Sequence, residues 1–183
     1  MITAPAPLRR GPLLAATIVA IEEAQALRER IKAGSIAPDP HTPITLWDQR
    51  VWRNELCMPG RCGTTLCLAG WAAQLGGGEW FITYGPDGPL MAGQPTDLPE
   101  YRWAPLLHYM VAAPGDPEHA ITEFSGHRII PVQVKAMLYL CLKPMICRNK
   151  DGEIERGVHH EMFLGHLTLS DVRHWYARLY LPA

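Results

Sequence analysis

The residues best suited to chemistry in this sequence are Cys62, His127 and Gln49. Cys62 stands where a turn-rich stretch leads into an apolar segment, and a thiolate at a helix start would be stabilised by free backbone N–H groups. His127 precedes a short apolar run and could act as a general base, and Gln49 could donate a hydrogen bond to an oxyanion. Together they predict a cysteine-dependent hydrolase or transferase.

The order of these three residues is similar to that in papain-like and bacteriocin-processing cysteine peptidases. In those families a glutamine lies a few residues before the nucleophile, whereas Gln49 is 13 residues from Cys62. In addition, Pro131 shortens the strand expected after His127, and no asparagine or aspartate in the segment directly after it is an obvious orienting partner for that histidine. The peptidase resemblance is therefore kept as an alternative.

Two motifs surround Cys62. The first is Trp47-Asp48-Gln49, followed by Trp52, and the second is C-G-T-T-L-C-L-A-G-W-A at residues 62–72. Together they resemble a group of small uncharacterised proteins of phages and bacteria that carry W-D-Q and C-G-T-x-x-C-x-A-G-W-A. This resemblance covers about residues 14–76, with weaker similarity over residues 132–142. It implies a phage-like or accessory origin and no assigned activity.

The cysteines have two other interpretations. Because cysteine is among the most buried residue types, Cys62 and Cys67 could be small core side chains in a closely packed helix. Alternatively, thiols and imidazoles could hold zinc, although their spacings match no common zinc signature. The candidate ligands are Cys57, Cys62, Cys67, Cys141, Cys147, His159, His160 and His166. We therefore predict no cofactor and keep a zinc site as an alternative.

Composition limits the class of protein. The chain has 183 residues, 48% of them hydrophobic, with 17 basic and 18 acidic side chains, which predicts one globular domain over residues 1–183. A net charge of -1 and the absence of a long basic run argue against nucleic acid as a partner. Five cysteines, an odd number, favour reduced thiols and a cytoplasmic protein.

The N-terminal segment imitates a secretion signal, with Arg9 and Arg10 before an apolar run at residues 13–21. Glu22 and Glu23 interrupt that pattern. The same residues fit a longer amphipathic helix over about residues 12–33. No apolar run reaches the roughly 18 residues that a membrane-spanning helix needs, so no membrane association is expected.

The remaining pattern predicts a mainly helical α+β fold in a single compact domain with a small β-hairpin. An apolar segment indicates a buried helix over about residues 63–75, and a Gly-Pro-Asp-Gly turn indicates a hairpin over about residues 80–92. Two later amphipathic segments predict helices over about residues 131–143 and 170–181, the second capped by Ser170.

Aromatic residues suggest a role in binding. The chain has six tryptophans and six tyrosines and two proline-rich loops, a composition that favours a protein partner. Four aromatics of the loop-rich middle are the expected anchors: Trp80, Tyr84, Tyr101 and Trp103. An accessory protein that binds a protein partner is therefore the first functional hypothesis, ahead of the cysteine enzyme and the zinc protein.

Overall fold

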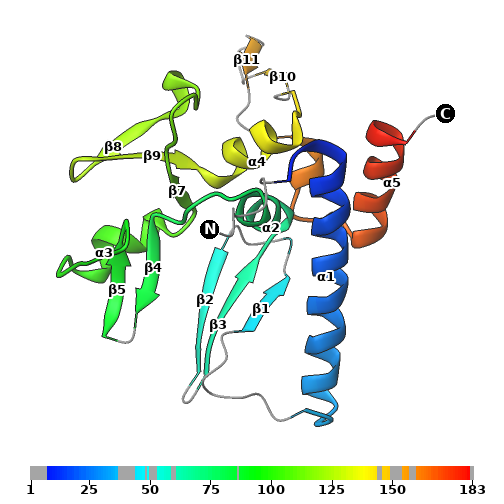
Figure 1. The fold of residues 1–183 in the computed structure, drawn as a ribbon, viewed down its shortest axis with the longest axis horizontal. Helices are drawn as coiled ribbons and strands as arrows, with labels where there is room; N and C mark the ends of the chain where they lie inside the picture. The colour runs from blue at the N-terminus through cyan, green and yellow to red at the C-terminus, as the bar shows by residue number, and fades with distance from the viewer. Residues whose placement is uncertain are drawn as a thin grey trace, which may run out of the picture.

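A computed structural model describes residues 8–36, 44–47, 49, 53–58, 61–85, 87–143, 146–148, 154–156 and 160–181. Its helices are α1 (Arg10–Lys32), α2 (Leu68–Leu75), α3 (Glu100–Trp103), α4 (Val132–Leu140) and α5 (Leu169–Tyr180), with 3-10 turns η1 (Ala104–Leu106), η2 (Glu118–Ala120) and η3 (Glu161–Phe163). The predicted mainly helical α+β fold is confirmed (Figure 1).

The strands among the described residues form four small sheets. Sheet A contains β1 (Ile44–Trp47), β2 (Arg53–Met58) and β3 (Arg61–Leu66); sheet B contains β7 (Tyr109–Val111), β8 (Thr122–Phe124) and β9 (His127–Pro131). Sheet C contains β4 (Ile82–Gly85), β5 (Gly88–Met91) and β6 (Gln94–Pro95), and β10 (Ile146–Arg148) pairs with β11 (Ile154–Arg156). The predicted hairpin is β4 and β5, to which β6 adds a third strand.

Helix α2 lies at the centre of the fold, between α1 and α4 (Figure 1). Its residues from Leu68 to Ala73 are buried, and four of these six are glycine or alanine, so neighbouring helices can approach closely. The main core joins α2 to apolar residues of α1, α4, α5 and η3. A second cluster, which includes Phe81 and Trp103, fills the space between sheets B and C.

Helix α1 coincides closely with the segment predicted at about 12–33. Its buried residues include Leu14, Ile18 and Ile21, which follow the helical period and face the core. Gly34 follows it with φ of 69°, and this left-handed conformation lets the chain turn away from the helix. Among the described residues, no helix is both long and apolar enough to cross a membrane.

Sheet A occupies residues that the sequence pattern assigns in part to a helix. β3 pairs in parallel with β1 and antiparallel with β2, so the chain is extended as far as Leu66 and the helix begins only at Leu68. Thr64 and Thr65 are β-branched and favour an extended backbone, which explains why the helix does not start at residue 63.

The later helices begin and end close to their predicted positions. α4 follows Pro131 and ends at Leu140, three residues before the expected end at 143, and its C-cap Cys141 has a left-handed φ of 54°. α5 is capped by Thr168 and not by Ser170. The Thr168 hydroxyl accepts a hydrogen bond from the backbone of Asp171, and the Asp171 carboxylate accepts one from the backbone of Thr168.

Candidate functional site

The two motifs of the sequence meet at the buried side chain of Gln49. Its Oε1 accepts a hydrogen bond from the backbone N–H of Leu68 at 2.9 Å, and its Nε2 donates to the carbonyl oxygens of Met162 at 3.3 Å and Leu164 at 3.2 Å. The Leu68 N–H belongs to the first turn of α2, where backbone donors have no partner within the helix. Gln49 therefore joins α2 to η3.

The predicted role of Gln49 as an oxyanion donor does not fit this arrangement. Both donor directions of its amide already point to backbone carbonyls, and only 6% of the residue is exposed. A substrate oxyanion would have to displace those bonds in the core. We therefore correct the assignment of Gln49 from an oxyanion donor to a structural link between two segments.

Cys67, and not Cys62, stands at the start of the helix. Its Sγ accepts a hydrogen bond from the backbone N–H of Gly70 at 3.5 Å, as an N-cap does. Burial raises the pKa of the Cys67 thiol to about 12, an effect larger than the opposing one of the backbone N–H groups. At neutral pH this thiol is protonated and has no nucleophilic character.

We expect Cys67 to resist alkylation by iodoacetamide in the folded protein. Because it is buried and protonated, its reaction should be at least about 100-fold slower than that of exposed Cys141 and should require unfolding. Peptide mass spectrometry of samples quenched over time measures both rates in one experiment. Native labelling of Cys67 as fast as that of Cys141 would contradict the assignment of Cys67 as a buried cap.

Cys62 and His127 lie on different sheets. Cys62 is the second residue of β3 in sheet A, where it is paired in register with Cys57 of β2, and His127 is the first residue of β9 in sheet B. Figure 1 shows these two strand ends at separate extremities of the molecule. His127 instead packs on the ring of Phe81, at 5.6 Å between ring centroids. The structure does not bring the predicted nucleophile and base together.

An open groove of about 790 Å³ lies beside the Gln49 link. Its walls are one face of α1, the segment before α5, and the first turns of α5, with Trp47 at the end of β1. The lining residues are Glu22, Gln25, Ala26, Arg28, Glu29, Trp47, Gln49, Gly165, Leu167, Leu169 and Arg173. The groove therefore combines apolar side chains with charges of both signs.

An ion pair and a tryptophan ring form part of the walls of this groove. Arg173 of α5 donates to one carboxylate oxygen of Glu22 on α1 from Nη2 at 2.5 Å and from Nε at 3.1 Å. Trp47 is half-buried, and among the described residues its buried indole nitrogen has no hydrogen-bond acceptor. The Trp47 ring packs against the main core.

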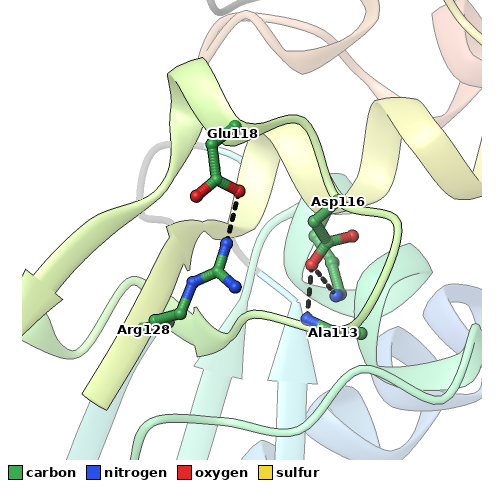
Figure 2. A network of polar contacts seen from close by, with 5 residues as sticks. Ala113, Asp116, Glu118 and Arg128 are labelled. Atoms are coloured by element: carbon green, nitrogen blue, oxygen red, sulfur yellow. Dashed lines mark hydrogen bonds and ion pairs between the residues drawn. The ribbon is translucent and has the colours of Figure 1, made fainter. Parts of the chain in front are cut away.

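A second polar cluster fixes the loop at residues 112–117. Figure 2 shows Asp116 beside Ala113, whose backbone N–H donates to Asp116 Oδ2 at 2.7 Å, and a separate ion pair between Glu118 and Arg128. Asp116 Oδ2 also accepts from Nζ of Lys135, a residue of α4, at 2.5 Å. The Asp116–Lys135 pair is almost completely buried, whereas the Glu118–Arg128 pair is exposed.

The predicted partner anchors divide into two groups. Trp80 and Trp103 are buried, which corrects their assignment as surface anchors: Trp80 donates to Gln74 Oε1 at 2.9 Å, and Trp103 belongs to the second core cluster. Tyr84 and Tyr101 are exposed, Tyr101 by 75%. The Tyr84 ring packs edge-on against Trp103, with 5.9 Å between centroids, so it extends that core to the surface.

The described residues contain no group of three or more histidines, cysteines or acidic residues arranged to hold a metal ion. His160 accepts a hydrogen bond at Nδ1 from the backbone N–H of Met162 at 3.1 Å and packs on Trp175. Burial lowers the pKa of His160, consistent with a neutral ring that accepts this bond. His159 lies outside the described residues, and the zinc site stays a prediction.

Three comparisons with known proteins place the chain in no family. No family model matches the sequence, and no curated protein and no solved structure is similar to it at a significant level.

Proposed function

We propose that this protein is an accessory protein that binds a short segment of a partner protein in the groove beside Trp47. The observation that carries the proposal is a half-buried tryptophan in a concave site that also contains Arg28 and Arg173. Tryptophan and arginine are the residue types most enriched at binding hot spots, and concave positions are where they contribute most. The groove therefore has the composition of a peptide-binding site.

The chemistry of the groove indicates the kind of segment that fits. Trp47, Leu167 and Leu169 offer apolar surface, and the α1 wall presents Glu22 and Glu29 together with Arg28. An amphipathic peptide with one large apolar side chain and flanking charges of both signs would match these walls.

The cysteine enzyme is the weaker alternative. Cys67 is buried and protonated, Gln49 is occupied, and Cys62 and His127 lie on separate sheets. The resemblance to small phage and bacterial proteins and the odd number of cysteines support a phage-like accessory protein that acts in the cytoplasm.

Selection from a displayed library of random linear peptides tests the binding proposal. We expect enriched peptides to bind the wild-type protein and to lose affinity at least about tenfold in Trp47→Ala, as hot-spot truncations do. Tyr101→Ala is the matched control, because it removes an exposed aromatic ring outside the groove. Fluorescence anisotropy of a labelled peptide measures each dissociation constant.

A second variant separates binding from folding. Arg28 lines the groove and is exposed, so Arg28→Glu changes the wall without disturbing the core. Selected peptides with a net negative charge should bind this variant at least about threefold more weakly, and those with a net positive charge at least about threefold more tightly. The proposal fails if no peptide is enriched, or if Trp47→Ala and Arg28→Glu bind the enriched peptides as the wild-type protein does.

A further inference from the structure

Two of the five cysteines are paired in register on neighbouring strands of sheet A. The antiparallel register of β2 and β3 pairs Met58 with Arg61 and, next to it, Cys57 with Cys62. Directly opposed residues in an antiparallel pair have α-carbons about 4.5 to 5.5 Å apart. A disulfide needs about 4.4 to 6.8 Å between α-carbons. The backbone therefore places Cys57 and Cys62 at a separation that a disulfide can join.

We propose that Cys57 and Cys62 form a reversible dithiol–disulfide couple that exchanges with a low-molecular-weight disulfide such as glutathione disulfide. In the first step the thiolate of one cysteine attacks a sulfur of that disulfide, forms a mixed disulfide and releases one thiol. The second cysteine then attacks the protein sulfur of the mixed disulfide and releases the other thiol. Two protein thiols are oxidised, and one small disulfide is reduced to two thiols.

The other three cysteines have different surroundings. Cys67 is buried with a raised pKa, and Cys141 ends α4, where its Sγ accepts a hydrogen bond from Arg10 Nε at 3.3 Å. Cys147 in β10 is paired in register with Glu155 and not with a cysteine. Among the described strands, Cys57 and Cys62 are thus the pair that the register brings together.

The position of this pair in sheet A gives the couple a structural consequence. β3 is the central strand of sheet A and leads directly into α2. Its pairing with β1 extends to its last residue, where Leu66 lies opposite Trp47. A covalent bond between β2 and β3 fixes their register, which otherwise could slip and turn every side chain to the other face. Figure 1 shows the pair's end of the sheet pointing away from α2.

Mass spectrometry of the full chain tests the couple. Reduced protein is incubated at neutral pH with glutathione disulfide, quenched with acid and digested by trypsin without reduction; trypsin cuts after Arg61 and so separates the two cysteines. We expect a disulfide that joins the peptide of residues 54–61 to the peptide beginning at Cys62. The peptide that begins at Cys62 also contains Cys67, and Cys67→Ser removes this second cysteine. The variant should keep the link, because serine is a good helix cap and preserves the start of α2.

Cys57→Ser should lose the link and carry a glutathione adduct on Cys62. Repeating the equilibration in urea tests the contribution of the fold: we expect the equilibrium constant for the link to be at least about tenfold larger in the folded protein. The proposal is overturned if the folded protein gives no link, if the link joins Cys62 to Cys141 or Cys147, or if folded and unfolded chains give equal constants.

Discussion

Replacing Asp116 by alanine is expected to lower the free energy of unfolding by about 3 to 5 kcal/mol. The side chain of Lys135 is only 1% exposed and that of Asp116 only 8%, so the substitution leaves an ammonium group buried without its counter-charge. It also removes the acceptor of the Ala113 N–H, which fixes the loop at residues 112–117. Urea denaturation followed by circular dichroism measures the change.

Two variants show whether the cause is the buried charge. Adding Lys135→Met to Asp116→Ala removes the charge as well and should recover more than half of the loss, because a buried pair can be replaced by apolar groups. Glu118→Ala breaks the exposed pair with Arg128 and should lower stability by no more than about 1 kcal/mol. Equal losses in Asp116→Ala and Glu118→Ala would refute the importance of burial.

Replacing Gln49 by alanine is the second substitution with a large expected effect, a loss of about 2 to 4 kcal/mol. It leaves the backbone N–H of Leu68 and the carbonyl of Met162 buried without their partner. Hydrogen exchange should show the greatest loss of protection in the first turn of α2 and in η3, because Gln49 joins these two segments.

Gln94→Ala is the control for this substitution, because Gln94 is exposed in β6 and should change stability by less than about 0.5 kcal/mol. Gln49→Glu keeps the acceptor for Leu68 but places a charge among carbonyl oxygens, so it should be at least as unstable as Gln49→Ala. A stable Gln49→Glu protein would mean that the link is not needed to hold α2 and η3 together.

Features that depend on local pattern were predictable from the sequence. The amphipathic period of α1, the Gly-Pro-Asp-Gly turn between β4 and β5, and the apolar stripe of α5 each determine an element without reference to the rest of the chain. The fold class follows from those elements. The cap of α5 was missed because serine is intrinsically a slightly better cap than threonine, and only the backbone conformation identifies Thr168 as the cap.

Sheet A was missed because its pairing is not local. β1 and β3 pair directly and in parallel, but β2 lies between them in the sequence. No tight turn therefore connects the two strands and identifies the pair. The apolar residues after Cys62 are compatible with a helix as well as with a buried strand, and periodicity alone does not separate the two. Pro59-Gly60 was the one local sign of the hairpin formed by β2 and β3.

The site was predictable only in part. The W-D-Q motif drew attention to Gln49, but its bonds to Met162 and Leu164 span more than a hundred residues and have no signature in the sequence. Trp80 and Trp103 were expected at the surface because they lie near loops, yet both are buried, Trp80 in the main core and Trp103 in the second cluster. Tryptophan content alone does not distinguish a surface anchor from a core residue.

The binding of a selected peptide can be located directly by the nitrogen–proton NMR signals of the six tryptophan indoles, assigned with tryptophan-to-phenylalanine variants. The groove proposal predicts that the Trp47 signal shifts most on titration, while the signals of Trp80 and Trp103 stay in place. The dissociation constant fitted to the Trp47 shift should equal the one found by anisotropy. A titration that shifts Trp80 or Trp103 and leaves Trp47 unchanged would contradict the proposed site.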